Sequence, residues 1–418
     1  MDDALDLLLH DARVVTCDGP DGAPLGVVER GAVGVRGGRV AWIGPAAEAP
    51  RAARRIDAGG RVLLPGLVDP HTHLVFAGSR VDELARRLGG EDYRAIAAAG
   101  GGIAATVRAT RAASDEALFD AAAARALALR ARGVTSVEIK SGYGLELAHE
   151  LRSLAVARRL AREGIVRVTT SLLGAHAVPK ERAGDRAGYL EEVATQMIPR
   201  AIEAGLADAC DVYLDDGAFS RDEAARVLGA AKAAGLAVRA HVGQFADLGG
   251  AELAAELGAR SADHLEQVSD AGLRAMAAAG VTAVLLPGAW RTLRQTPPDA
   301  ARMRRLGVRV AVGTDCNPGT SPTVDLPLMA ALAARDAGLE LDECVLAITR
   351  EAARAAGLAE AGRIRVGWPA DLALFEEDDP RALAYALGGT MARAVVLGGA
   401  VVLGGLVEDE PPPRAPLW

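Results

Sequence analysis

The feature that most constrains the fold is an alternation of apolar, strand-like runs with helical stretches through the middle of the chain. Each run ends in polar residues, and a stretch rich in Ala, Leu and Arg follows most of them. Eight such repeats predict an α/β fold, a (β/α)8 TIM barrel. The eight runs cover residues 62–73, 134–140, 166–176, 209–215, 237–241, 261–265, 281–286 and 308–315. The helical stretches include residues 115–132, 145–163, 188–204, 221–234 and 342–356.

A doubly wound α/β sheet is the alternative architecture for this pattern. That fold binds nucleotides at a Gly-rich turn directly after a strand. No predicted strand is followed by such a turn, and Gly100, Gly101 and Gly102 lie in a helical region instead. The pattern therefore favours the barrel. Residues 74–133 are long for one loop and helix, so we expect them to carry an insertion that covers the substrate.

The two ends of the chain differ from the middle. Residues 7–16, 31–35 and 39–43 have the pattern of short strands separated by Gly turns. Residues 370–375 and 394–403 are strand-like as well. We therefore expect a small β-sandwich domain formed by both termini, residues 1–62 and 363–418, beside a barrel of residues 63–362.

Composition narrows the class of protein. The 47 basic and 55 acidic residues give a net charge of −8, which argues against a nucleic-acid partner because phosphate binding needs a basic face. The four cysteines are far apart, unlike those of a disulfide framework or a structural zinc site. The chain opens with Met1-Asp2-Asp3, and no apolar run reaches ~18 residues. We expect a cytoplasmic protein with no membrane partner.

Histidines gather where the predicted strands end. In a barrel of this kind the chemistry is located at the C-terminal ends of the strands. In His71-Thr72-His73 both imidazoles point to the same side, since side chains alternate along a strand. Five of the seven histidines lie at such ends, namely His71, His73, His176, His241 and His264.

A metal site is the interpretation that best explains the first, fifth and eighth runs together. His241 ends the fifth run and Asp315 ends the eighth. Taken alone, His241 reads as a hydrogen-bonded core histidine and Asp315 as a turn or capping residue. With His71 and His73 they supply three imidazoles and one carboxylate, which suit one divalent metal, Zn²⁺ or Fe²⁺/Fe³⁺. The ligand types leave zinc and iron open.

Several motifs resemble the amidohydrolase superfamily, and within it the imidazolonepropionase family. The segment PGLVDPHTH, the histidines of the fifth and sixth runs and the GTD of the eighth carry the wider resemblance. The narrower resemblance extends over nearly the whole chain. It is carried by HTHLVFAGSR (71–80), EIKSGYG (138–144), LLGAHAVP (172–179), SADHLE (261–266) and GTDCNPGTSP (313–322).

The resemblance implies a hydrolase that opens the ring of 4-imidazolone-5-propanoate, a small-molecule substrate, to give N-formimidoyl-L-glutamate. It implies one metal ion and, from similar proteins, a homodimer. By the same resemblance, Gln244 and His264 lie beside the attacking water, and Asp315 belongs to the catalytic centre. The implied metal ligands are His71, His73, His241 and Asp315. The implied substrate-binding residues are Arg80, Tyr143, His176, Gln244, Asn317, Gly319 and Thr320.

The chemistry of the residues agrees with these roles. A propanoate tail needs a cation, and the planar guanidinium of Arg80 matches a carboxylate, although a solvated surface arginine is the simpler alternative. Tyr143 lies between two glycines, where loop packing would also explain it. The segment from Asn317 to Thr320 has the composition of a β-turn that can direct its amides at the site.

One position departs from many members of the superfamily. Three residues after the histidine of the fifth run, where many carry a glutamate, this chain has Gln244. An amide cannot transfer a proton, so His264 or Asp315 must do so. Lys140 ends the second run rather than the fourth, where some relatives bridge two metals with a modified lysine. That difference favours one metal and leaves Lys140 without an assigned role.

Two other functions stay open from the sequence. A different mononuclear amidohydrolase, such as a guanine or formimidoyl-glutamate deaminase, would use the same four ligands but release ammonia. The other is a non-catalytic barrel that acts as a binding protein. Such a protein would not require the four metal ligands together with Arg80 and Tyr143.

Overall fold

The computed structural model describes residues 4–91 and 100–404. The chain divides into two compact units. One comprises residues 1–70, 127–136 and 325–418, and the other residues 71–126 and 137–324. The predicted domain boundaries at 62/63 and 362/363 stay a prediction.

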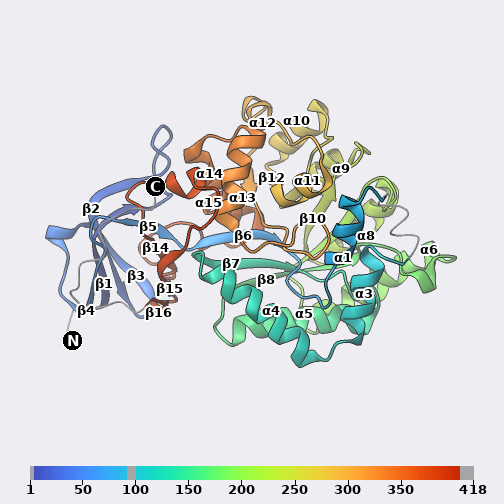
Figure 1. The fold of residues 1–418 in the computed structure, drawn as a ribbon, viewed down its shortest axis with the longest axis horizontal. Helices are drawn as coiled ribbons and strands as arrows, with labels where there is room; N and C mark the ends of the chain where they lie inside the picture. Colours follow the sequence, from blue (N-terminus) through green and yellow to red (C-terminus); the bar gives the residue numbers. More distant parts are fainter. Residues whose placement is uncertain (1–3, 92–99, 405–418) are drawn as a thin grey trace. The chain divides into compact units, whose positions relative to one another are not determined.

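Both ends of the chain contribute to one eight-stranded sheet, which we call the terminal sheet. Its order is β16-β15-β14-β5-β1-β2-β3, and β4 also pairs with β1. Strands from the start and the end of the chain therefore lie side by side, blue and red in Figure 1. Its strands are β1 (Leu5–Val15), β2 (Val27–Arg36), β3 (Arg39–Pro45), β4 (Ala52–Asp57), β5 (Val62–Pro65), β14 (Leu372–Phe375), β15 (Ala392–Leu397) and β16 (Ala400–Leu403).

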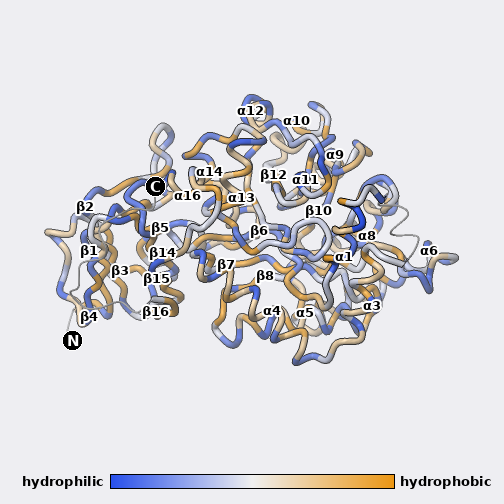
Figure 2. The backbone as a smooth tube through the Cα atoms, in the orientation of Figure 1, coloured by the Kyte–Doolittle hydropathy of each residue, from blue (hydrophilic) through white to orange (hydrophobic). Residues whose placement is uncertain are grey.

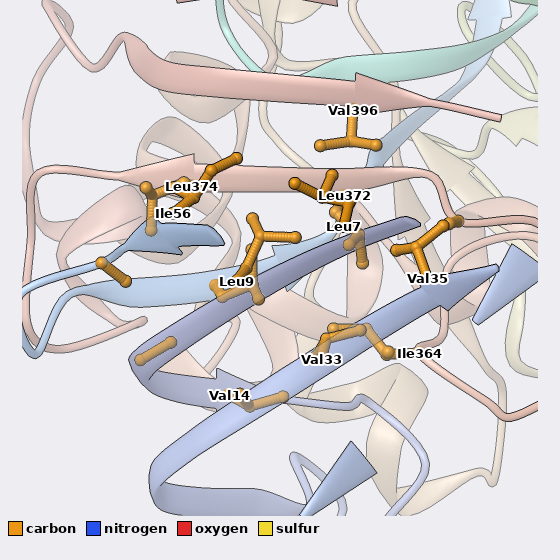
Figure 3. Close-up of a cluster of buried hydrophobic side chains, with 14 of the residues drawn as sticks. Leu7, Leu9, Val14, Val33, Val35, Ile56, Ile364, Leu372, Leu374 and Val396 are labelled. Carbon is orange, nitrogen blue, oxygen red and sulfur yellow. The ribbon is translucent and has the colours of Figure 1, made fainter. Parts of the chain in front are cut away.

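The terminal sheet encloses an aliphatic core shared by its N-terminal and C-terminal strands. Leu7 and Leu9 of β1 pack in one cluster with Leu372 and Leu374 of β14 (Figure 3). Figure 2 shows the corresponding hydrophobic stretches along β1 and β15. The small β domain predicted from both termini is thus confirmed. Strand β4 was missed because its Ala-Arg-Arg stretch lacks clear alternation.

The second sheet is parallel and has the order β13-β12-β11-β10-β9-β8-β7-β6. A parallel bridge between Thr72 of β6 and Cys316, four residues after the end of β13, brings the two ends of the sheet together. The predicted (β/α)8 barrel is therefore confirmed. Its strands are β6 (Leu67–Thr72), β7 (Val134–Lys140), β8 (Arg167–Ala175), β9 (Ala209–Leu214), β10 (Ala237–Val242), β11 (Ser261–His264), β12 (Thr282–Leu285) and β13 (Val310–Val312).

The first predicted barrel run, residues 62–73, is wrong as a single strand. It divides at Gly66 into β5, which joins the terminal sheet, and β6, which opens the barrel. Pro65 has no N–H for a continuing ladder, and a Cβ on Gly66 would lie 2.1 Å from Thr135 Oγ1. A glycine is required because the backbone at this position lies in close contact with Thr135 of β7.

Helices follow the barrel strands, and several begin at good capping residues. Ser220 forms a capping box with Glu223 at the start of α8. In the long region after β6, α1 (Val81–Leu88), α3 (Ile103–Ala112) and α4 (Asp115–Arg130) are described. The next helices are α5 (Leu147–Arg162), α6 (Arg186–Glu192), α7 (Ile198–Glu203), α8 (Arg221–Ala233), α9 (Gly250–Leu257), α10 (Asp270–Ala279), α11 (Pro287–Leu293) and α12 (Ala300–Arg305). Those of the C-terminal part are α13 (Leu326–Leu332), α14 (Leu341–Ala347), α15 (Arg350–Ala356) and α16 (Ala382–Tyr385).

Two further expectations concern membrane-spanning helices and the cysteines. Among residues 4–91 and 100–404, no helix has both the length and the apolar character needed to cross a bilayer. The four cysteines are buried as free thiols.

Candidate active site

The site residues lie where the barrel strands end. His71 and His73 lie at the end of β6, His241 is in β10, and His264 is the last residue of β11. Asp315 follows β13 by three residues. All five belong to the unit of residues 71–126 and 137–324. The strand ends therefore bring together residues that are up to 244 positions apart in the sequence.

Three histidines form a compact buried group. One ring nitrogen each of His71, His73 and His241 lies within 4.8 Å of the others, and the three residues are at most 3% exposed. The Oδ1 atom of Asp315 lies 3.5 Å from Nε2 of both His71 and His73. The structure thus brings together all four predicted ligands.

The spacing and chemistry of these donors fit a divalent metal ion. A tetrahedral ion with bonds of about 2.0–2.1 Å needs ligand atoms roughly 3.3 Å apart, close to the 3.5 Å found here. In the described part of the chain, Nε2 of His241 is buried and has no hydrogen-bond partner. A buried imidazole nitrogen in that state is costly unless it meets a cation. Three nitrogens and one carboxylate oxygen suit a divalent ion of the zinc or iron type.

Backbone hydrogen bonds hold the ligand segments together. The N–H of Asp315 donates to the carbonyl of His71 at 2.9 Å, and the N–H of His73 donates to the carbonyl of Cys316 at 3.1 Å. Asp315 and His264 have φ angles of 53° and 82°. Positive φ is unfavourable for residues with a side chain, and such strain concentrates at functional sites.

Two buried carboxylates orient the histidines from behind. Oδ2 of Asp263 lies 2.6 Å from Nδ1 of His71, and Oδ1 of Asp211 lies 3.1 Å from Nδ1 of His241. With the proton held on Nδ1, Nε2 is free of hydrogen and faces the cluster, as in carboxylate–histidine–metal sites. Neither carboxylate is predicted from the sequence, although Asp263 precedes His264 in SADHLE.

A lysine lies among the carboxylates below the histidines. Nζ of Lys140 is 2.7 Å from Asp211 Oδ2, 3.1 Å from Glu138 Oε1 and 3.6 Å from Asp263 Oδ2. Burial by itself would lower the pKa of Lys140, but Asp211, Glu138 and Asp263 raise it above its ordinary value. Lys140 is therefore a charged, paired residue of the barrel interior.

A cavity of about 970 Å³ opens above the ligand group. Gly319 stands behind its wall, because a Cβ at that position would lie 2.1 Å from Nη1 of Arg80. The structure therefore brings the predicted substrate-binding residues to one place. Those that line the cavity are Arg80, Tyr143, His176, Gln244, Asn317 and Thr320.

Arg80 is not a solvated surface arginine. It precedes α1, its side chain is 9% exposed, and it forms an ion pair of 2.8 Å with Glu83. Its guanidinium is one wall of the cavity. A planar cation in this position can form paired hydrogen bonds with a carboxylate.

The SGYG loop is fixed by one buried carboxylate. Glu150, near the start of α5, accepts hydrogen bonds from the backbone N–H groups of Gly142, Gly144 and Leu145. This arrangement holds Tyr143, 4% exposed, at the cavity. Nδ1 of His176 lies 3.0 Å from the carbonyl oxygen of Gly142, and burial lowers the pKa of His176 to about 3.

The turn after Asp315 is shaped by Asn317. Its Oδ1 accepts the N–H groups of Gly319 and Thr320, each at 2.8 Å, and its Nδ2 donates to the carbonyl of Asp315 at 2.7 Å. The side chain of Asn317 is thus engaged in building the turn. That turn positions Gly319 against Arg80.

Gln244 and His264 face the cavity from neighbouring strands. The hydroxyl of Tyr213 donates to Oε1 of Gln244 at 2.8 Å. The His264 ring centroid is 5.6 Å from that of His241. Its Nδ1 lies 3.8 Å from Oε1 of Glu266, a buried carboxylate within SADHLE that is not predicted from the sequence.

Comparisons with known proteins agree with this geometry. The sequence pattern of the amidohydrolase family matches residues 62–402. The chain belongs to the amidohydrolase family. It is 52% identical to an imidazolonepropionase of Acidiphilium cryptum over 94% of this chain and 98% of the relative. It is 47% identical to an imidazolonepropionase of Paracoccus denitrificans over 94% of this chain and 100% of that one. The resemblance inferred from the motifs is confirmed.

Solved structures show the same fold. A 5-methylcytosine deaminase from Klebsiella pneumoniae has a TM-score of 0.71 at 19% identity, covering 98% of this chain and 100% of its own. An adenosine deaminase from Xanthomonas campestris with bound zinc has a TM-score of 0.70 at 22% identity, covering 98% and 95%. At these identities the similarity supports the fold alone.

Proposed function

We propose that the chain is a hydrolase that opens the ring of 4-imidazolone-5-propanoate, giving N-formimidoyl-L-glutamate. The observation that carries the proposal is one cavity lined by three of the four metal-type donors, His73, His241 and Asp315, and by Arg80. An imidazolone ring with a propanoate tail presents a carbonyl for the first group and a carboxylate for the second. About 50% identity to imidazolonepropionases over nearly the whole chain supports the same reaction.

We infer that His71, His73, His241 and Asp315 hold one divalent ion, zinc or iron. When bound, such an ion lowers the pKa of a coordinated water and polarises a carbonyl oxygen. Asp211 and Asp263 contribute by keeping Nε2 of His241 and His71 directed at the centre.

The chain's other residues bind and orient the substrate. In the proposal, Arg80 pairs with the propanoate, and Tyr143 closes that side of the cavity. His176, which is neutral because burial lowers its pKa, contacts the ring. The turn of Asn317, Gly319 and Thr320 supports Arg80 and borders the substrate. Gln244 presents its amide N–H₂ to the ring, because Tyr213 donates to its oxygen.

Proton transfer is assigned to His264. Gln244 has no titrating group, and Asp315 is directed at the histidines. His264 takes a proton as water oxygen adds to the ring carbonyl carbon. It then delivers a proton to the ring nitrogen when the C–N bond breaks. Glu266, 3.8 Å from Nδ1 of His264, stabilises the protonated imidazole.

The test is incubation of purified protein with 4-imidazolone-5-propanoate, following loss of the imidazolone absorbance together with released ammonia. We expect ring opening without ammonia and about one zinc or iron per chain. Ammonia release would favour a deaminase instead. Protein without metal or turnover would favour a binding protein.

His264→Ala tests the assignment of the proton carrier. We expect kcat to fall about a hundredfold or more with the metal content unchanged. Gln244→Glu serves as the comparison, and we expect it to remain active. If His264→Ala kept a normal kcat, the proton carrier would be Asp315 or His176. If His264→Ala lost the metal, His264 would be a metal ligand.

A further inference from the structure

Lys140 is a cation enclosed by the barrel, below the ligand group. Its side chain is 0% exposed, and it is not among the described residues that line the cavity. It therefore does not contact substrate in the proposed reaction. Its three nearest charged neighbours are the carboxylates of Glu138, Asp211 and Asp263, also 0% exposed.

Buried carboxylates at this density require a cation. An ionised carboxylate without a partner is strongly destabilised away from water. An ammonium group has three N–H donors, which matches three carboxylates around one point. Arg239 is the other cation nearby, with Nε 3.8 Å from Oε1 of Glu138. Lys140 forms ion pairs with both Asp211 and Asp263, at 2.7 and 3.6 Å.

Two of the carboxylates connect Lys140 to histidines on different strands. Asp211 faces Nδ1 of His241 through Oδ1 and Lys140 through Oδ2. Oδ2 of Asp263 lies close to both Nδ1 of His71 and Nζ of Lys140. One ammonium group thus links the orienting partners of His71 in β6 and His241 in β10. Glu138 contacts the ammonium through Oε1, at 3.1 Å.

We propose that Lys140 is a positioning residue that holds Asp211 and Asp263 so that Nε2 of His71 and Nε2 of His241 converge on one ion. The proposal rests on the metal centre inferred above. It assigns Lys140 a geometric role. If Lys140 only balanced charge, any change that kept the interior neutral would leave the centre intact.

Three variants separate these roles. Lys140→Met removes the ammonium at similar length. Lys140→Met/Glu138→Gln removes one positive and one negative charge, which keeps the charge balance and protects folding, but leaves Asp211 and Asp263 unlinked. Glu138→Gln alone is the matched control, because Lys140 and both orienting carboxylates remain.

The measurements are Zn²⁺ affinity by competition with a chromophoric chelator and the visible absorption of the Co²⁺-loaded proteins. We expect roughly 10–100-fold weaker Zn²⁺ binding in both variants that lack Lys140, with an altered Co²⁺ spectrum. Glu138→Gln should keep wild-type affinity and spectrum. Wild-type affinity in the double variant would overturn the positioning role, and so would unchanged or tighter binding in Lys140→Met.

The wild-type protein separates this inference from the proposed function. If wild-type protein bound no Zn²⁺, the metal centre itself would be wrong. If it bound Zn²⁺ and the double variant bound equally well, only the role of Lys140 would be wrong.

Discussion

Leu9 in the terminal sheet and Lys140 in the barrel are both 1% exposed, but their surroundings are opposite. Leu9 contacts other aliphatic side chains in a cluster of buried hydrophobic residues. Lys140 is enclosed by carboxylates and lies beneath a group of histidines. Burial of aliphatic area favours folding by about 25 cal/mol per Å². Burial of charges costs free energy that their pairing recovers only in part. The terminal sheet therefore contributes mainly to stability, and the interior of the barrel mainly to the chemistry of the site.

Removal of a predicted metal ligand from the barrel should have a large effect on activity and none on the terminal sheet. We expect His241→Ala to lose the metal and several kcal/mol of transition-state stabilisation, roughly a thousandfold or more in kcat/KM. Metal content and steady-state kinetics measure this. His10→Ala, in β1 of the terminal sheet, is the matched control and should change neither. Full metal content in His241→Ala would remove His241 from the ligand set.

The converse change is in the terminal sheet. Leu9→Ala should lower the free energy of unfolding by roughly 2–5 kcal/mol, since it leaves a cavity in the aliphatic cluster. Urea unfolding of the metal-free protein measures the loss. The folded fraction should keep wild-type kcat and KM. A selective loss of kcat without loss of stability would contradict the division between the two regions.

Arg80 tests substrate binding separately from metal binding within the cavity. We expect Arg80→Ala to lose roughly 2–4 kcal/mol of transition-state stabilisation, because the propanoate loses its cation. The loss should appear as a lower kcat/KM, mostly through a higher KM. The metal content should stay unchanged. Arg86→Ala, in helix α1 directly after Arg80, is the control, since Arg86 pairs with Glu91 at the surface. Unchanged kinetics in Arg80→Ala would assign substrate binding elsewhere.

The smallest expected effect concerns Glu266. Burial lowers the pKa of His264, but Glu266, Asp315 and Asp263 raise it to a net value above the ordinary one. Because His264 must be neutral to accept a proton, its activity is lost as pH falls through that pKa. Glu266→Gln should lower the pKa, so the acidic limb of the kcat profile moves to lower pH. We expect kcat at neutral pH to fall about tenfold, since a charge pair at this distance contributes on the order of 1 kcal/mol or more.

A pH–rate profile measures both effects. Glu256→Gln, where the carboxylate pairs with Arg221 at the surface, is the control. An unmoved acidic limb in Glu266→Gln would show that Glu266 does not act on His264.

Most of the fold and the rim of the site could be predicted from the sequence. Periodicity predicts the barrel strands, and residues at their ends share one mouth, so His71, His241 and Asp315 converge. Strand β4 and the break at Gly66 could not be predicted, because a weakly alternating segment and a change of sheet leave no strong local pattern. The homodimer and the cytoplasmic location stay predictions.

The layer beneath the ligands was not predictable in the same way. Asp211 and Glu138 lie inside strand runs, where a charged residue reads locally as an exception to an apolar pattern. Asp211 in β9 pairs with Lys140 of β7 and His241 of β10, and pairing across a barrel depends on register. The role of Lys140 depends on the positions of three carboxylates from three strands, which the sequence does not give.

The pairing of β5 has a consequence for the time course of synthesis. β5 pairs with β1 on one side and with β14 on the other, and β14 comes about 300 residues later in the chain. At ~5–20 residues per second, roughly 15–60 s pass between the two segments at the ribosome. Until then one edge of β5 has unpaired N–H and C=O groups, which can pair with other chains. A nascent chain that pauses within the barrel therefore keeps this edge open, and aggregation during expression should depend on how fast the barrel is translated.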